Sequence, residues 1–344
     1  LYGYLNKPYL DKPADTLADE VIAAIFENLL YDRKNRFFTS LFDRWCNSKK
    51  DYDLLIKYLE EFPIPEDLDI WLLPPNHPFG KIDYLWLSDL AKNMNDQEWI
   101  NSKSVLFRER SKSNISKDLG IKFWEDIVTI ITFDKKEINK IHSFNEAVTY
   151  YTTKLYKLDR AIRQLYTKLL NQKGIIKPIQ EFYEQIINQY LEKWFEYFDV
   201  YKQNQQGLLK RIFEENKTPV AVIVGDGINY EIAKGISEKL GDEFETAPGL
   251  VCSDFPSETE NNMSRIYFEE DIIEPIQAVR QKKLIESVKQ DIHFLNIDEI
   301  SYSDLYEHLV VIAKDVDSLS EKMQQKALKY FELIETQLTD TIKI

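Results

Sequence analysis

The chain contains 344 residues, of which 44 % are hydrophobic and 30 % are charged, a composition typical of globular proteins and unlike that of disordered or fibrous ones. Its 58 acidic and 44 basic residues give a net charge of −14, which opposes unspecific binding to nucleic acids or anionic membranes. The two cysteines, Cys46 and Cys252, exclude a disulfide framework and Cys-rich zinc ribbons, and no apolar run approaches the roughly 20 residues of a membrane span. We therefore expect a soluble, cytoplasmic protein.

Residues 1–205 predict a mostly helical domain. Between residues 150 and 170, apolar side chains recur every three or four positions, which places them on one face of a helix. Pro178 predicts the start of a second helix, and the aromatic residues between 182 and 198 predict that it is buried over most of its circumference. The proline-rich stretch from Pro63 to Pro78 predicts a connection that crosses the surface. The basic residues of the first helix are Lys154, Lys157, Arg160, Arg163 and Lys168.

Residues 206–344 predict an α/β domain, because strands and helices alternate after a joint at residues 203–207. The run VAVIV at residues 220–224 is short, apolar and β-branched, and it is bounded by Pro219 and Gly225, as expected of a buried parallel strand. The further predicted elements are a helix over 230–240, strands over 244–251, 293–297 and 309–313, and a final helix over 318–341. The expected fold is thus a helical domain followed by a parallel-sheet domain.

Asp226 is the first candidate site residue. It stands between Gly225 and Gly227 directly after the VAVIV strand, and ligands of open parallel sheets bind beyond the carboxyl ends of the strands. A carboxylate at this place is a natural ligand for a divalent metal ion. The alternative interpretation is that Asp226 caps the helix that follows.

A hydroxyl-bearing segment follows the predicted strand 244–251. Ser257 or Thr259 at a helix start would lie where free backbone N–H groups and the helix dipole favour a phosphate. A nearby metal ion would lower the pKa of the hydroxyl enough for nucleophilic attack. The alternative is an ordinary capping box between Ser257 and Glu260.

Two acidic residues follow the strand predicted over 309–313. Asp317 and Glu321 are four positions apart across a helix entry, so both carboxylates are able to face one metal ion. Alternatively, Asp317 or Ser318 caps the last helix, and Glu321 only interacts with its positive end. Because converging carboxylates repel one another without a cation, three such loops at one sheet edge favour a metal site.

Three segments resemble the successive motifs of the PglZ domain, a branch of the alkaline phosphatase superfamily. They are VAVIVGDGINYEIA, DFPSETENNM and LVVIAKDVDSLSEK. The helical stretch TKLYKLDRAIRQLYTKL is similar to the region that precedes this domain, so the resemblance covers about residues 145–344. It implies a protein of a bacterial BREX antiphage system, with other BREX subunits as partners.

The resemblance also implies a reaction: phosphoryl transfer between two metal ions, usually zinc and with manganese as the other option, on a phosphodiester such as a nucleotide or nucleic acid. By position, Asp226 resembles the first metal ligand. Thr259 resembles the nucleophile, which also binds metal, and Asn262 resembles an oxyanion-binding asparagine. Asp317 and Glu321 resemble further metal ligands, and Ser257 is the other candidate nucleophile.

The chain departs from the family pattern in its metal ligands. The superfamily completes its site with an Asp-His pair, whereas no histidine of this chain follows an aspartate. We interpret all four histidines as surface or packing residues: His77, His142, His293 and His308. Because the sequence starts at Leu1 and ends at Ile344, before the strand that should carry the Asp-His pair, we expect a fragment that binds metal poorly and catalyses little.

Other functions are open as well. A Gly-Asp-Gly followed by Asn-Asn also occurs in thiamine diphosphate enzymes, but here the spacing is too long, and no dinucleotide-binding glycine motif follows VAVIV. The main alternative to an enzyme is a scaffold subunit of a defence complex with a degenerate or truncated metal site. The basic helix face at residues 154–168 would then contact nucleic acid or, as we favour for so acidic a chain, only solvent.

Overall fold

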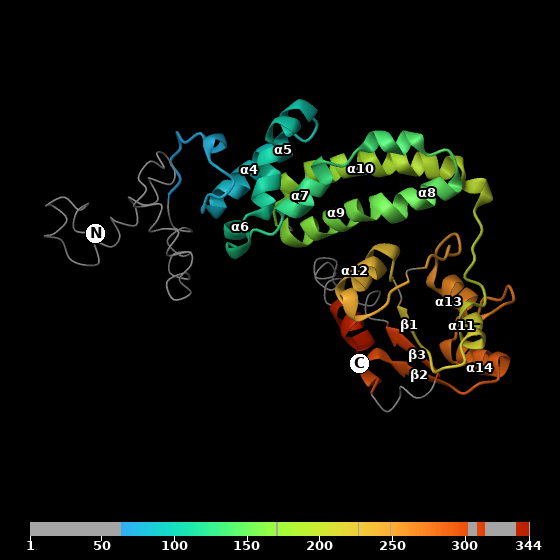
Figure 1. The fold of residues 1–344 in the computed structure, drawn as a ribbon. Helices are drawn as coiled ribbons and strands as arrows, with labels where there is room; N and C mark the ends of the chain where they lie inside the picture. The colour runs from blue at the N-terminus through green and yellow to red at the C-terminus, as the bar shows by residue number, and fades with distance from the viewer. Residues whose placement is uncertain are drawn as a thin grey trace, which may run out of the picture. The chain divides into compact units, whose positions relative to one another are not determined.

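The computed structural model describes residues 63–169, 171–225, 227–247, 249–301, 308–313 and 335–343. It is mostly helical and contains a small three-stranded parallel sheet (Figure 1). The chain divides into two compact units. The first contains the described residues up to Phe133 together with 168–185, and the second contains the described residues of 134–167 and from Ile186 onward. The domain boundary at residue 205 stays a prediction.

The first unit is a small helical bundle around an aromatic core. Trp86, Phe107 and Trp124 are fully buried, and the rings of Phe107 and Trp124 stack with their centroids 4.9 Å apart. Side chains cap two of the helices, because Asp96 accepts from a backbone N–H of α5 and Ser113 from one of α6. The elements are the short 3-10 helix η3 (Ile70–Leu72), α4 (Gly80–Lys92), α5 (Gln97–Lys112), α6 (Asn114–Asp118) and α7 (Trp124–Ile131).

A buried ion pair lies within this aromatic core. The Arg110 guanidinium donates to both carboxylate oxygens of Asp83, from Nε at 2.7 Å and Nη2 at 2.6 Å. The indole Nε1 of Trp124 donates to the same carboxylate at 2.6 Å. Arg110 Nη1 also donates to the carbonyls of Pro75 (2.9 Å) and His77 (2.7 Å). Both charged groups are therefore fully paired, as burial at 0 % exposure requires.

The proline-rich stretch after Pro63 forms no regular helix except η3, as its prolines predict. The expectation that it crosses the surface is correct only for part of it. Leu73, His77 and Phe79 are buried, because the stretch closes over the ion pair just described.

Further helices follow the 3-10 turn η4 (Lys135–Lys140) along the chain. They are α8 (Phe144–Tyr150), the π-helical turn η5 (Tyr151–Leu155), α9 (Tyr156–Leu169) and α10 (Lys173–Glu196). The apolar stripe expected over 150–170 is confirmed by its buried residues Leu155, Leu158, Ile162, Leu165 and Leu169. Within the described ranges, no helix combines the length and the apolar character that crossing a bilayer requires.

Two expectations for the second long helix are wrong. α10 begins at Lys173, and Pro178 lies inside it. The proline ring removes only the backbone bond to Gly174, an exposed residue whose carbonyl water can hydrate. Burial over most of the circumference also fails at the carboxyl end, because Phe195 remains 55 % exposed.

The second unit contains the α/β layer. Its elements are α11 (Leu208–Glu215), β1 (Ala221–Gly225), α12 (Tyr230–Leu240), α13 (Thr259–Tyr267), α14 (Gln277–Val288), β2 (Ile292–Asn296), β3 (His308–Ala313) and a helical segment at 335–343. Its 3-10 turns are η4 (Lys135–Lys140), η6 (Phe198–Val200), η7 (Gly241–Glu243) and η8 (Ile297–Glu299). The strands are parallel in the order β1-β3-β2, so the α/β character is present but small.

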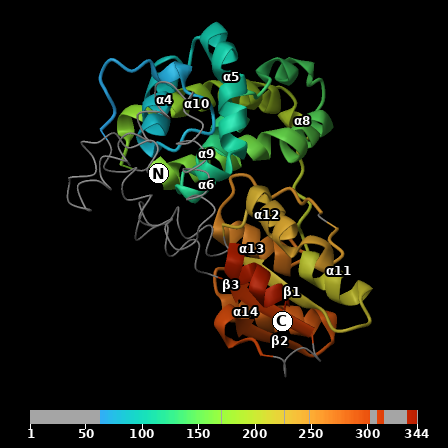
Figure 2. The same cartoon turned by 60° about the vertical axis from the view of Figure 1, so that its left-hand side comes forward.

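Helices cover both faces of this sheet (Figures 1 and 2). Val310 and Ile312 of β3 pack on one side against α11, α13 and α14, whereas Leu309 and Val311 pack on the other against α12 and Leu338 of the last helical segment. Alternate residues of a strand point to opposite faces, so a strand buried on both sides must be apolar throughout. This explains the LVVIA run of the central strand β3. The expectation of a buried strand for VAVIV is correct only in part, because β1 lies at the edge of the sheet and is partly buried.

The strand expected over 244–251 is absent from the described residues of that range. Phe244, Leu250 and Val251 are 37–45 % exposed instead, and this segment pairs with no strand. A Pro-Gly pair interrupts its apolar run, which prevents a continuous ladder. Of the final helix, 335–343 is described and helical, whereas the predicted start at 318 lies outside the described residues.

Candidate functional site

The predicted site lies at the carboxyl edge of the sheet. β1 and β3 are neighbours, and their last residues, Gly225 and Ala313, stand opposite each other in the register. The segments with the predicted acidic ligands therefore leave the same edge from adjacent strands, which are about 4.8 Å apart. Asp226, Asp317 and Glu321 themselves lie outside the described residues.

The turn after β1 depends on its two glycines. A Cβ atom on Gly225 would lie 2.2 Å from Cγ1 of Ile228, closer than two carbon atoms can approach. Gly227 has a φ of 73°, in the left-handed region that side chains other than glycine's rarely adopt. The Gly-Asp-Gly sequence thus meets a local geometric need whatever the role of the residue between the glycines.

Asn229 caps helix α12. Its side-chain oxygen accepts a hydrogen bond from the backbone N–H of Ile232 at 3.0 Å. The interpretation of Asp226 as the cap of this helix is therefore wrong, because Asn229 already occupies the N-cap position. The metal-ligand hypothesis for Asp226 stays a prediction, because Asp226 lies outside the described residues.

Thr259 is the first residue of α13, as expected for a hydroxyl at a helix start, and its side chain is exposed. The N-cap residue is Glu258, which makes no side-chain capping bond. The expected capping box of Ser257 and Glu260 does not form, because Ser257 Oγ accepts instead from the Asn262 amide at 2.9 Å.

Asn262 is held by three hydrogen bonds. Its Oδ1 accepts from the backbone N–H of Asp254 at 2.8 Å and from Nε2 of the buried Gln205 at 2.5 Å. Its Nδ2 donates to Ser257, as described above, which leaves the second N–H of the amide without an acceptor among the described residues. Sequence reasoning missed Gln205, because the two partners are 57 positions apart.

An ion-pair cluster fixes the base of the same loop. Arg265 of α13 donates from Nε to Asp254 at 3.1 Å and from Nη1 to Asp271. The two carboxylates raise the pKa of Arg265, with Asp271 contributing most. Asp254 is thereby neutralised and is no metal ligand in this arrangement.

The described residues contain no group of three or more His, Cys, Asp or Glu side chains that would hold a metal ion. The four histidines agree with their interpretation as packing or surface residues. His77 is buried against Trp86, and His308 Nδ1 accepts from a backbone N–H at 3.3 Å beside Phe213. The two exposed histidines are His142 and His293.

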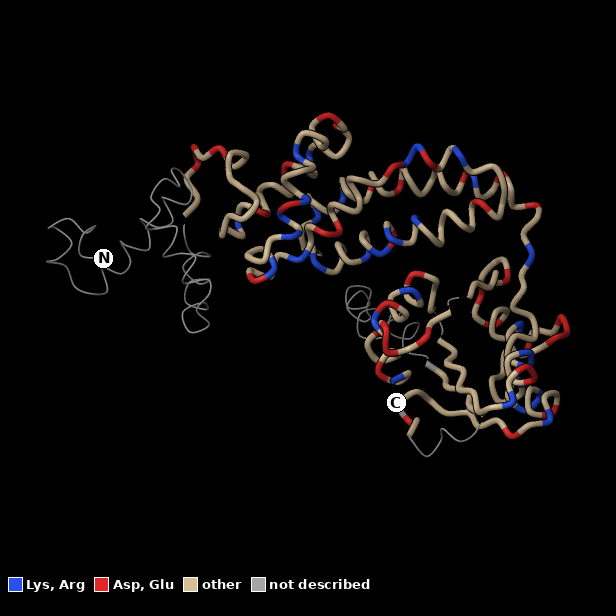
Figure 3. The backbone as a smooth tube through the Cα atoms, viewed as in Figure 1, with Lys and Arg blue, Asp and Glu red and all other residues tan. Residues whose placement is uncertain are grey.

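The basic face of α9 is paired with acidic groups. Glu231 of α12, which is 2 % exposed, accepts from Arg160 Nε at 3.0 Å and from Arg163 at 2.9 and 2.7 Å. Arg163 also donates to Glu335 at 3.1 Å, and Arg160 to Glu238 at 2.5 Å. Figure 3 shows basic residues along α9 and acidic residues in α12.

These ion pairs concern the two interpretations of the basic face at residues 154–168, which are contact with nucleic acid and contact with solvent only. Lys154 pairs with Glu137, and Lys168 with Asp126 at 2.7 Å, so four of the five basic side chains have acidic partners. The expectation of a solvated face is correct for Lys154, Lys157 and Lys168, which are exposed. It is wrong for Arg160 and Arg163, whose ion pairs are largely buried, and few unpaired charges are left for a nucleic-acid backbone.

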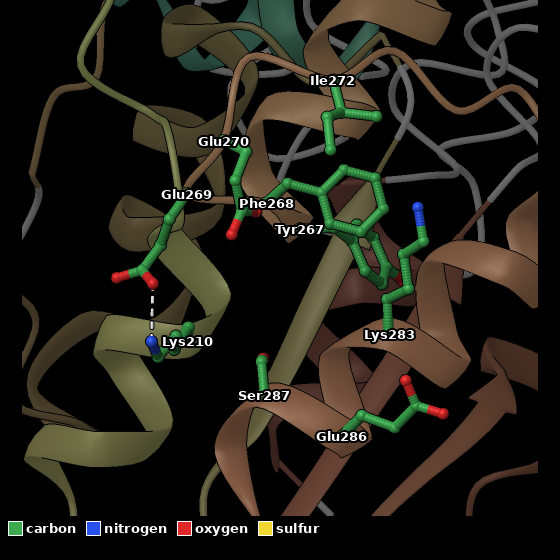
Figure 4. Close-up of a pocket in the computed structure, with 9 residues that line it drawn as sticks. All are labelled: Lys210, Tyr267, Phe268, Glu269, Glu270, Ile272, Lys283, Glu286 and Ser287. Carbon is green, nitrogen blue, oxygen red and sulfur yellow. Dashed lines mark hydrogen bonds and ion pairs between the residues drawn. The ribbon is translucent and has the colours of Figure 1, made fainter.

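A cavity of about 370 Å³ lies between α11, α14 and the segment after α13 (Figure 4). Lys210 on its wall is paired with Glu269 at 2.6 Å, and Lys283 Nζ stands 5.0 Å from the centre of the Phe268 ring. Tyr267, another lining residue, is the last residue of α13, about 12 Å along the helix from Thr259. This cavity is therefore no part of the predicted site.

No protein-family model, curated protein or solved structure matches this chain. The resemblance to PglZ domains thus rests on the three short motifs and the helical stretch before them. The function has to be argued from the residues and their geometry.

Proposed function

We propose that this chain carries part of the active site of a PglZ-like, metal-dependent phosphodiesterase. Asp226, Asp317 and Glu321 would bind divalent metal ions, and Thr259 would be the nucleophile. The observation that carries the proposal is the register of the sheet, in which Gly225 and Ala313 end adjacent strands at one edge. The acidic segments that follow these residues start side by side, and clustered carboxylates need a cation.

The donor set favours manganese or magnesium over zinc. Three carboxylates and a hydroxyl supply only oxygen, the ligand type that hard cations prefer, whereas zinc sites in proteins usually include His or Cys. The described histidines are engaged in packing or lie exposed elsewhere. The proposal therefore differs from the zinc that the family resemblance implies.

Thr259 is the better placed of the two candidate nucleophiles. It stands at the amino end of α13, where backbone N–H groups and the helix dipole attract a phosphate, and its side chain is exposed. The Ser257 hydroxyl lies before the first turn of the helix and accepts a hydrogen bond from Asn262. This hydrogen bond positions Asn262, whose remaining N–H is available to a phosphate oxygen.

In the proposed reaction, the Thr259 oxygen attacks phosphorus as its proton passes to water, and the bond from phosphorus to the leaving alcohol oxygen breaks. Water then hydrolyses the phosphothreonine ester and restores the hydroxyl. The metal ions, when bound, lower the pKa of the hydroxyl and neutralise charge on the phosphate. Asn262 and the first turn of α13 would hold the phosphate oxygens.

The test is hydrolysis of bis(p-nitrophenyl) phosphate with Mn²⁺, Mg²⁺ or Zn²⁺, together with calorimetric titration of each metal. Thr259→Ala should lower the metal-dependent rate to the background measured without protein, as expected for loss of a nucleophile. The matched control Ser257→Ala should retain most activity. Asp226→Asn should weaken metal binding. Equal rates for wild type and Thr259→Ala would exclude Thr259 as the nucleophile.

A scaffold role is the second candidate, and an exposed aromatic cluster favours it. Phe195 and Phe255 are 55 % and 62 % exposed, and Phe198 joins them, with its ring centre 5.0 Å from that of Phe255. Exposed aromatic groups of this kind are typical of protein interfaces. A protein that binds neither Mn²⁺ nor Zn²⁺ but loses complex formation on Phe255→Ser would have this role instead.

A further inference from the structure

A second cavity, of about 300 Å³, lies in the second unit between η5, the carboxyl half of α10 and residues 250–253. This volume is at the lower end of the range of small-molecule sites, about 300–1,000 Å³. Its wall is predominantly apolar and contains no Lys, Arg, Asp or Glu. The lining residues are Val148, Tyr151, Thr152, Tyr190, Leu191, Trp194, Tyr201, Leu250, Val251, Cys252 and Ser253.

Four aromatic rings follow one another along this wall. The ring centres of Tyr151 and Tyr190, of Tyr190 and Trp194, and of Trp194 and Tyr201 are each 6.2 Å apart. The planes of neighbouring rings are inclined by 35°, 40° and 61°, so the rings form a curved surface rather than a flat stack. Concave arrangements of aromatic rings are the known protein sites for alkylated ammonium ions.

The opposite wall is fixed to the same part of the chain. Asn204 accepts from the backbone N–H of Cys252 at 2.7 Å through its side chain, and its own backbone N–H donates to the carbonyl of Cys252 at 3.2 Å. Tyr201 donates its hydroxyl to the carbonyl of Ser253. These bonds hold residues 250–253 beside the rings without a regular strand.

All three tyrosine hydroxyls of the wall donate to acceptors in the protein. Tyr151 donates to Asp159 at 2.9 Å, Tyr190 to the carbonyl of Ala147 at 3.1 Å, and Tyr201 to Ser253. The phenols thus offer no O–H to an anionic ligand. A phenol that donates to a carboxylate or carbonyl also gains electron density in its ring, which strengthens attraction to a cation.

The electrostatic surroundings of the cavity also favour a positively charged ligand. Burial, followed by the negative charge of Asp159, raises the pKa of both Tyr151 and Tyr190. Because the Asp159 carboxylate disfavours a negative charge on these phenols, it favours a positively charged ligand beside them. No basic side chain lines the cavity to repel it.

We propose that this cavity binds a quaternary or otherwise alkylated ammonium group. The methyl groups of such an ion would contact Leu250, Val251 and the aromatic rings, and its diffuse charge would face the rings. An uncharged apolar ligand of the same shape would make the apolar contacts but would lack the attraction between a positive charge and the aromatic rings. The inference uses no residue of the proposed hydrolytic site and does not depend on it.

The experiment is a calorimetric titration of the protein with choline and with its uncharged isostere 3,3-dimethyl-1-butanol. The two compounds differ in one atom and one charge, so the comparison isolates the cation. Choline should bind saturably and about tenfold more tightly than the alcohol, within the range that cation–π contacts give at partly desolvated sites.

Variants at the cavity sharpen the test. Trp194→Leu should remove most of the preference for choline over the alcohol, whereas the matched control Trp99→Leu, in the first unit, should leave it unchanged. Leu250 is 44 % exposed, so charged substitutions there should not prevent folding. Leu250→Arg should weaken choline binding at least tenfold, and Leu250→Glu should preserve or strengthen it.

Several outcomes would overturn the proposal. Equal affinity for choline and the alcohol, or tighter binding of the alcohol, would mean an ordinary apolar cavity. Absence of binding by both compounds would mean that the cavity takes no ligand of this class. Equal effects of Leu250→Arg and Leu250→Glu would show that charge plays no part.

Discussion

The two units of the molecule bury a carboxylate in different ways. In the first, Asp83 shares no exposed surface with solvent and is paired with a single arginine, Arg110, which is itself 0 % exposed. In the second, Glu231 is equally buried but is shared by Arg160 and Arg163, whose side chains stay 21 % and 13 % exposed. The first arrangement is a closed part of a core, whereas the second joins α9, α12 and the segment 335–343 through groups that still touch water.

This difference predicts different costs of breaking each cluster. A fully buried charge that loses its partner cannot be hydrated, whereas a partly exposed guanidinium can. Breaking the closed cluster should therefore cost more stability than breaking the open one. Each is measured as a free energy of unfolding in urea.

Arg110→Met should have the largest effect, a loss of about 3–5 kcal/mol, because it leaves the Asp83 carboxylate buried without its cationic partner. The conservative control is Asp83→Asn combined with Arg110→Met, which removes both charges and should recover part of the loss. Equal stability of the single and double variants would contradict this account.

The Arg110→Met loss should also depend on pH. Burial raises the pKa of Asp83 above its ordinary value, and Arg110 opposes this rise, so the variant should have a higher pKa still. A raised pKa in the folded state means that stability is retained below the ordinary pKa of about 4 and is lost as pH rises through the raised value. The deficit of the variant should therefore be larger at pH 8 than at pH 5.

Glu231→Gln should cost less, about 2–3 kcal/mol, although Glu231 accepts from two arginines. Arg163 retains Glu335 and Arg160 retains Glu238 as partners, and both guanidiniums are partly hydrated. A loss as large as that of Arg110→Met would mean that the two clusters are not different in kind.

Asn229→Ala should cost about 1 kcal/mol, because it removes the cap of the helix that presents Glu231. Asp226→Ala is the matched control, since it removes a carboxylate near the same helix end without removing the cap. It should change stability by less than about 0.5 kcal/mol in the absence of metal. A larger effect of Asp226→Ala would restore the capping interpretation.

Salt should give the smallest effect. Raising sodium chloride should shrink the Glu231→Gln deficit by about 0.5 kcal/mol or less, because screening reaches partly exposed charges. The Arg110→Met deficit should stay constant, since ions do not enter the closed core. Parallel urea titrations at two salt concentrations measure both.

The sequence predicted elements whose cause is local. Strands β1 and β3 were predictable because both runs are continuously apolar, although only the central strand β3 is buried on both faces and the edge strand β1 is partly buried. The expected strand over 244–251 failed because its apolar residues form no ladder and instead remain exposed near Tyr201 and Asn204.

The candidate site was predictable only in its local parts. The helix start at Thr259 is determined by neighbouring residues. In contrast, the hydrogen bond between Gln205 and Asn262 joins positions 57 apart, and the ion pair between Arg160 and Glu231 joins positions 71 apart. The hydrophobic periodicity of the sequence does not indicate such long-range contacts. The convergence of Asp226, Asp317 and Glu321 stays a prediction.

The π-helical turn Tyr151–Leu155 also limits how the chain can change in length. Such a turn contains one residue more than an α-helical turn, so it shifts the phase of all that follows by about 100°. Excising a single residue there would restore an ordinary α-helix but rotate α9 relative to α8. The guanidiniums that now meet Glu231 would then turn away from it.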